Sequence, residues 1–73
     1  MKINFKHFSG FEIERVFFTA DYAEIVLPGH ESENDIFTVY GRLVENNEAV
    51  ALLDLDSKEC AESVLKQFYL MID

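Results

Sequence analysis

The sequence is poor in the residues that build covalently linked or metal-held folds. Its 73 residues include one cysteine and two histidines. A single cysteine excludes an intramolecular disulfide framework and a thiolate metal cluster, and it fits a reducing compartment such as the cytoplasm. No His-x-x-x-His or Cys-x-x-Cys pair occurs, so the chain has little with which to bind zinc. We therefore predict no metal and no cofactor.

Long apolar runs are also missing. A membrane-spanning helix needs about 20 mainly apolar residues, and a signal peptide needs a basic stretch followed by an apolar one. Neither pattern occurs in the sequence, and its three glycines are too dispersed to form a phosphate-binding loop. We expect no membrane contact.

Basic residues are scarce, because six Lys and Arg stand against fourteen Asp and Glu, which gives a net charge of −8. Direct binding to nucleic acid needs the opposite sign and is disfavoured. The acids are concentrated, with a net −3 in residues 28–35 and −5 in residues 45–62. Such a charge either serves solubility or attracts a basic partner surface. For the second interpretation, the candidate partner-binding acids are Glu31, Glu33, Asp35, Glu45, Glu48, Asp54 and Asp56.

The sequence does contain enough apolar material for a core. Hydrophobic residues make up 49% of it and aromatic residues 14%, which argues against disorder. We expect one small domain over residues 1–73, and a chain of this size buries roughly 60% of its unfolded surface.

Residues 57–72 are predicted to form one amphipathic helix. Their apolar residues recur at spacings of three and four, and either Asp56 or Ser57 can cap the start. Cys60 lies on the apolar stripe and is interpreted as a buried structural cysteine, whereas Leu70 falls on the polar side. The stripe consists of Cys60, Ala61, Val64, Leu65, Phe68, Met71 and Ile72, with Tyr69 at its border.

The N-terminal third is predicted to form strands. Residues 2–8 alternate polar and apolar side chains, and Ser9-Gly10 marks a turn. Residues 11–27 fit either two strands, over 11–19 and 22–27, or one helix. Their aromatic and β-branched content favours the strands.

The clearest pattern is a hairpin of two strands, residues 36–45 and 48–56, joined by Asn46-Asn47. Asparagine tolerates the positive φ that a two-residue turn requires. This turn pairs Glu45 with Glu48 and places apolar side chains on both faces. The first face is predicted to carry Phe37, Val39, Leu43, Val50 and Leu52, and the second Ile36, Tyr40, Val44, Ala49, Ala51, Leu53 and Leu55.

One helix can cover only one of these faces. The small side chains of Ala49 and Ala51 favour the second face, because they allow close approach. The first face, with Phe37, Val39 and Leu43, then needs the N-terminal strands, a second copy of the chain or a partner protein to cover it. The predicted fold is α+β: an antiparallel sheet of four to five strands with one C-terminal amphipathic helix packed on one face.

No group of residues indicates catalysis. His7 and His30 are interpreted as surface residues. Asp54 and Asp56 lie two apart near Glu59, and paired carboxylates can perform acid–base chemistry. So short a chain leaves little room for the pocket that a substrate needs. We predict that the protein is not an enzyme.

In organisation alone (a short acidic chain, hairpins, one C-terminal helix and no catalytic group), the sequence resembles the small inhibitors that bacteriophages and mobile elements encode, anti-CRISPR proteins among them. The resemblance implies a protein that masks a basic, nucleic-acid-binding surface of a host protein in the host-cell cytoplasm. The alternative is a structural or assembly protein, a homodimer joined through the face of Phe37, Val39 and Leu43.

Overall fold

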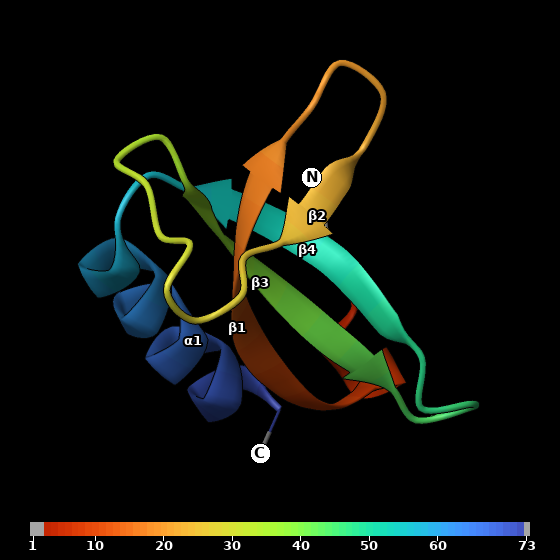
Figure 1. Cartoon of the computed structure of the whole chain (residues 1–73). Helices are drawn as coiled ribbons and strands as arrows, with labels where there is room; N and C mark the ends of the chain where they lie inside the picture. Colours follow the sequence, from red (N-terminus) through yellow and green to blue (C-terminus); the bar gives the residue numbers. More distant parts are fainter. Residues whose placement is uncertain (1–2, 73) are drawn as a thin grey trace.

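The structure is a four-stranded antiparallel sheet with one helix packed against it (Figure 1). The computed structural model describes residues 3–72. In chain order the elements are the 3-10 helix η1 (Phe5–His7), the strands β1 (Phe8–Phe18), β2 (Ala23–Ile25), β3 (Ile36–Leu43) and β4 (Ala49–Leu55), and the helix α1 (Lys58–Met71). The strand order in the sheet is β2-β1-β3-β4. The predicted α+β fold is confirmed.

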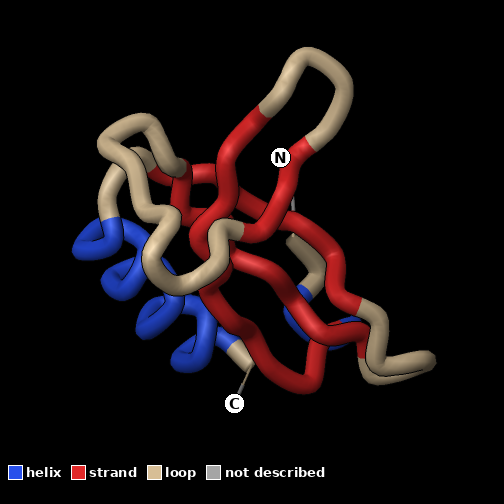
Figure 2. The backbone as a smooth tube through the Cα atoms, in the orientation of Figure 1, coloured by secondary structure: helices blue, strands red, loops and turns tan. Residues whose placement is uncertain are grey.

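Strand β1 connects the two halves of the sheet. It pairs with β3 from Phe8 to Val16, and its last three residues pair with β2. Residues 11–27 therefore form two strands and not a helix. The strand labelled β1 in Figure 1 is strongly bent along its length, as the backbone tube in Figure 2 also shows. Because β1 continues past the start of β3, the β1–β2 hairpin extends beyond the end of the sheet (Figure 1).

The core lies between α1 and one face of the sheet. Phe11, Val39 and Ala61 are buried there, at 5%, 0% and 0% exposure. The rings of Phe5 and Phe11 pack against Phe68, with centroids 5.3 and 5.1 Å from it. Burial of these apolar side chains is the main stabilising term of the fold. The partly buried side chains around them are Phe8, Ile13, Phe37, Leu52, Leu53, Leu55, Val64, Leu65 and Ile72.

The prediction that the helix sits on the face of Ala49 and Ala51 is wrong. The helix covers the face of Phe37 and Val39, while both alanines are exposed. The small side chain at the contact between helix and sheet is Ala61 of the helix, which is fully buried. The sheet can then present its larger apolar side chains, which bury more area.

The predicted register of the β3–β4 hairpin is also wrong. The N–H of Leu43 donates to the carbonyl of Glu48 at 2.9 Å, which closes a longer loop than the two-residue Asn46-Asn47 turn. Of the two asparagines, only the second has a positive φ, of 60°. A bulge in the β3–β4 pairing then brings both Leu52 and Leu53 onto the core. Consecutive residues of a regular strand point to opposite faces, so two adjacent core leucines require this irregularity.

The predicted strand over residues 2–8 is wrong for residues 3–7, and residue 2 lies outside the described residues. Phe8 alone is in a strand, as the first residue of β1. Phe5 to His7 form η1 instead, and the side chain of Asn4 accepts a hydrogen bond from the N–H of Lys6 at 3.2 Å. Phe5 and Phe8 both pack on the core. Residues three apart share a side on a helical turn but not on a strand. The predicted turn at Ser9-Gly10 is absent, because both residues belong to β1.

The helix begins after Ser57, whose side chain accepts a hydrogen bond from the N–H of Cys60 at 3.1 Å. Ser57 is therefore the N-cap, and Asp56 is not. The interpretation of Cys60 as a buried cysteine is wrong, because Cys60 is exposed. The side of the helix that faces the sheet is narrower than the full apolar stripe, and Met71 at its margin is 62% exposed.

Tyr69 ties the helix to the free edge of β1. Its hydroxyl donates a hydrogen bond to the carbonyl of Phe11 at 2.7 Å and accepts one from the N–H of Phe11 at 3.0 Å. The N-terminal part of β1 pairs with β3 on one side only, because β2 begins pairing at Val16. The tyrosine therefore supplies the hydrogen bonds that a further strand would have made at this point.

Candidate protein-binding surface

Exposed apolar side chains gather on the β1–β2 hairpin and the residues that follow it. Two lie at the end of β1, one in the turn, one in β2 and one just after β2. We call these five the hairpin patch: Phe17, Phe18, Tyr22, Ile25 and Leu27, which are 37%, 55%, 58%, 58% and 63% exposed. Large exposed apolar groups concentrated on one element are typical of an interaction site, whereas single ones are not.

The hairpin patch occupies a projecting element that is apolar on both faces. Phe18 pairs with Ala23 and Phe17 with Glu24, so the two adjacent rings point to opposite sides of the hairpin. Figure 1 shows the hairpin standing clear of the rest of the sheet. Thr19 orders its turn, because its hydroxyl oxygen accepts hydrogen bonds from the N–H groups of Asp21 and Tyr22 at 3.3 and 3.1 Å.

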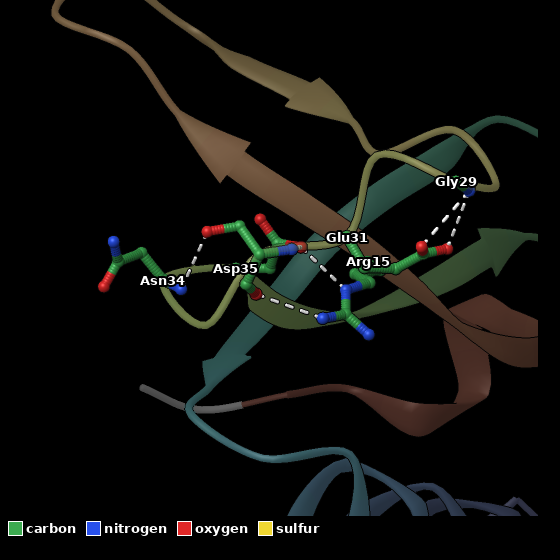
Figure 3. Close-up of polar contacts among 6 residues, drawn as sticks. Arg15, Gly29, Glu31, Asn34 and Asp35 are labelled. Atoms are coloured by element: carbon green, nitrogen blue, oxygen red, sulfur yellow. Dashed lines mark hydrogen bonds and ion pairs between the residues drawn. The ribbon is translucent and has the colours of Figure 1, made fainter.

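Residues 26–35, which connect β2 to β3, form an acidic loop beside the hairpin. The loop is tied to β1 by Arg15, whose Nε lies 2.7 Å from Oδ2 of Asp35 and whose Nη2 donates to the carbonyl of Ser32 at 3.1 Å (Figure 3). The same Oδ2 accepts the N–H of Ser32 at 2.7 Å. The Arg15 guanidinium and this N–H hold the pKa of Asp35 below its ordinary range.

Asp35 therefore has an internal role. It is 5% exposed and its charge is matched by Arg15, so the prediction that it contacts a partner through an exposed carboxylate is wrong. The alternating acids of the sequence do not reveal that Asp35 is the one in an ion pair. Its partner, Arg15, lies in β1, twenty residues earlier in the chain.

Glu31 and Glu33 remain available on the surface of this loop. Both are exposed. Glu31 accepts hydrogen bonds from the N–H of Gly29 at 3.1 and 3.2 Å (Figure 3). Backbone N–H groups, its own and that of Gly29, lower the pKa of Glu31. The carboxylate thus stays ionised and keeps its charge next to the hairpin patch.

The rim of the hairpin patch is acidic throughout. Asp21 and Glu24 are exposed on the hairpin itself, and Glu31 and Glu33 are exposed on the loop. Residues 16–35 contain no lysine or arginine. The apolar side chains are therefore bordered by uncompensated negative charge.

Of the other predicted acids, two lie at this end of the sheet and two at the other. Asp54 pairs with Thr38 near the start of β3 and accepts a hydrogen bond from the Thr38 hydroxyl at 2.7 Å. Asp56 follows the end of β4. Glu45 and Glu48 lie in the β3–β4 loop, at the opposite end of β3 from the acidic loop (Figure 1). The predicted acids therefore do not form one surface.

The predicted apolar contact residues are core or its margin. Val39 is fully buried beneath α1, and Phe37 packs against the same core. Leu43 is partly buried at the end of β3. A partner or a second copy cannot dock on Phe37 and Val39 while α1 covers them, so this part of the prediction is wrong.

Sequence reasoning missed the hairpin patch. Its clearest signal is the adjacent pair Phe17-Phe18: whichever register the strand adopts, one ring points to each face. A short two-stranded hairpin cannot bury both of its faces, so at least one of the two rings stays exposed to solvent. Tyr22, close to the turn, is a second signal of the same kind, because turns lie on the surface.

The remaining chemistry of the described residues is sparse. Within residues 3–72, no three His, Cys, Asp or Glu side chains are grouped so that they could hold a metal ion. No helix in that part of the chain is long and apolar enough to cross a membrane. Comparison with family models, with curated proteins and with solved structures finds no match to this chain. The function is therefore argued from the surface itself.

Proposed function

We propose that the protein acts without catalysis, by binding another protein through the hairpin patch and its acidic rim. The observation that carries the proposal is the concentration of five exposed apolar side chains on one projecting hairpin, bordered by carboxylates. Aromatic residues supply much of the energy of protein interfaces, and a charged rim adds specificity and a fast encounter.

The charge of the rim favours a different protein over a second copy of this chain. A symmetric dimer through the hairpin patch would bring the rims of two chains together, each of net charge −8 overall. Like charges across an interface cost several kcal/mol. A partner whose apolar contact surface is bordered by lysine and arginine has the complementary arrangement.

The most concrete form of this proposal is an inhibitor of the type that phages and mobile elements encode. A basic protein surface with apolar pockets is typical of a site that holds nucleic acid. The apolar hairpin would enter such a site while Glu31 and Glu33 occupy positions that phosphates otherwise take. The protein would then prevent the host protein, in the cytoplasm, from binding its nucleic acid.

The test is to capture partners from bacterial lysate with the tagged protein and to compare two variants. F18S/Y22S removes two exposed rings of the hairpin patch. L70S is the matched control, because Leu70 is 65% exposed on the last turn of α1, away from the hairpin. Circular dichroism should show that both variants stay folded, since exposed positions away from special contacts cost little stability.

We expect one partner that the wild type and L70S retain and F18S/Y22S loses. That partner, once purified, should lose its bound nucleic acid when the wild type is added. Retention of the same partner by F18S/Y22S would overturn the assignment of the hairpin patch. A partner that binds nucleic acid and this protein together would overturn the inhibitor form of the proposal.

A further inference from the structure

A cavity of about 430 Å³ opens between the hairpin patch and the acidic loop. One wall lies at the end of β1, where the ring of Phe17 shares a side of the strand with Arg15 and the ring of Phe18 points to the other side. The other wall is formed by polar side chains of the loop. Its lining residues are Phe17, Phe18, His30, Ser32, Asn34 and Asp35. The cavity is therefore part aromatic and part polar, and a ligand for it has to satisfy both walls.

The polar wall offers oxygen acceptors that the fold does not use. Internal hydrogen bonds to the Asp35 carboxylate both end on Oδ2. Among the described residues, no hydrogen bond engages Oδ1 of Asp35 or the side-chain amide of Asn34. Because the Asp35 side chain is 3% exposed, the acceptor open to an incoming N–H donor is the side-chain oxygen of Asn34, which is reached without displacing Arg15.

The local charge selects a cation over an anion. The loop carries Glu31, Glu33 and Asp35, and Arg15 is the one base that reaches it among the described residues. Arg15 matches the charge of Asp35, so the exposed carboxylates of Glu31 and Glu33 leave the loop beside the cavity with a net negative charge. A phosphate or carboxylate ligand would be repelled, while a cation would gain both from this charge and from the exposed ring of Phe17.

We propose that this cavity receives an arginine side chain of the partner protein, which makes it a specificity site within the surface described above. The inference rests on the proposed function, because the arginine belongs to the partner protein that binds the hairpin patch. Arginine fits better than lysine for a geometric reason. Its guanidinium is planar, stacks on aromatic rings and donates several hydrogen bonds in a fixed fork, whereas an ammonium is a compact, strongly hydrated point charge.

The experiment uses small probes and does not require the partner. The protein labelled with ¹⁵N is titrated at millimolar concentrations with N-acetyl-arginine methylamide, with the corresponding lysine compound and with the citrulline compound. Citrulline keeps the planar shape of arginine but lacks its charge. The readout is the chemical shift of the backbone amides of Ser32, Asn34 and Asp35.

We expect saturable shifts with the arginine probe, weaker ones with lysine, and none with citrulline at the same concentrations. F17L should weaken arginine binding about three-fold, as the loss of one cation–π contact predicts. L70S should leave it unchanged. Equal shifts with arginine and citrulline, no saturable shift, or an unchanged affinity in F17L would each overturn the arginine site.

Failure of this inference and failure of the proposed function are distinguishable. If the arginine probe does not bind but F18S/Y22S still loses its partner, the hairpin patch binds protein and the cavity does not take arginine. If the probe binds but F18S/Y22S keeps its partner, the cavity is a cation site and the hairpin patch is not the docking surface.

Discussion

At the scale of single residues, the carboxylate of Asp35 controls the placement of the acidic loop. It receives the guanidinium of Arg15 and the N–H of Ser32 on one oxygen. Arg15 itself lies over the ring of Phe37, with its Cζ 5.1 Å from the ring centroid. The loop is therefore linked through Asp35 and Arg15 to the core face of the sheet. This linkage keeps Glu31 and Glu33 beside the hairpin patch.

The first prediction concerns the pH dependence of this ion pair. The pKa of Asp35 in the folded protein is below its ordinary value of 3.8, so the unfolded chain binds the proton more readily. The stabilisation from Asp35 is complete above the unfolded pKa and is lost as the pH falls through the folded pKa. The change Asp35→Asn should therefore lower stability at pH 7, by an amount that shrinks at pH values below 3.8.

Urea unfolding of the wild type and D35N, followed by circular dichroism across this pH range, measures the difference directly. Asparagine keeps the size and one oxygen acceptor of the side chain but lacks its charge. D54N is the control, since Asp54 is exposed and its contact is a neutral hydroxyl. A stability difference between wild type and D35N that stays constant with pH would contradict the assignment of Arg15 as the partner.

At the scale of elements, the second prediction contrasts neighbouring residues of α1. Phe68 packs on the rings of Phe5 and Phe11, whereas Leu70 is 65% exposed. Phe68→Ala should cost about 3–5 kcal/mol, because it removes apolar contacts and leaves a cavity. Leu70→Ala should cost under about 0.5 kcal/mol.

The two alanine variants test whether α1 is held by one face. Urea midpoints with unchanged slopes would give the stability differences directly. A domain of this size is marginally stable, so the two variants and the wild type are all measured with a stabilising osmolyte present. Similar losses for the two variants would mean that the helix does not pack on the sheet through the side that carries Ala61 and Phe68.

Elements were predictable from sequence where one periodicity decided them. Helix α1 followed from the three-and-four spacing of its apolar residues, and β3 and β4 followed from runs of apolar residues on either side of Asn46-Asn47. Segment η1 was not predictable in this way. The alternation around Phe5 is equally strand-like, and only the joint packing of Phe5 and Phe8 on Phe11 selects the helical turn.

Pairing between elements was less predictable than the elements themselves. The bulge that places Leu52 and Leu53 together on the core depends on how two strands and a helix fit, which no local pattern contains. The role of Tyr69 is similar. Its hydroxyl bonds to Phe11, fifty-eight residues away in the chain, and helical periodicity places it only at the border of the apolar stripe.

The candidate site was predictable only in part, because one of its features depends on local sequence and the other on how the elements pack. Net charge and the exposed position of Glu31 and Glu33 can be read from composition and polarity. Which apolar face stays uncovered depends on where the helix docks. Choosing the Ala49 face for the helix assigned Phe37 and Val39 to the surface, although both belong to the core.

At the scale of the whole molecule, the distribution of charge separates two explanations of acidity. A net charge of −8 raises encounter rates with any basic partner, wherever the acids lie. A local acidic rim raises them chiefly for a partner that meets the hairpin patch. The fold offers a comparison between these explanations, because Glu31 and Glu33 lie beside the hairpin and Glu45 and Glu48 lie at the far end of β3 (Figure 1).

The third prediction uses the matched pairs E31K/E33K and E45K/E48K. Each reversal adds two charges, so either double variant changes the net charge from −8 to −4. At 0.1 M salt, E31K/E33K should slow association with the captured partner by roughly ten-fold, the lower end of the range for electrostatic steering, and should reduce the salt dependence of the association rate. E45K/E48K should slow it much less, because charges more than about 10 Å from the contact are largely screened at 0.1 M salt.

Association rates measured by surface plasmon resonance at several salt concentrations decide between the two. Asp35 is left unchanged in both variants, because its reversal would break the pair with Arg15 and test stability instead of binding. Equal slowing by the two variants would show that total charge, and not the rim, drives the encounter. The hairpin patch would then supply affinity alone, and its partner would be recognised without a matching basic border.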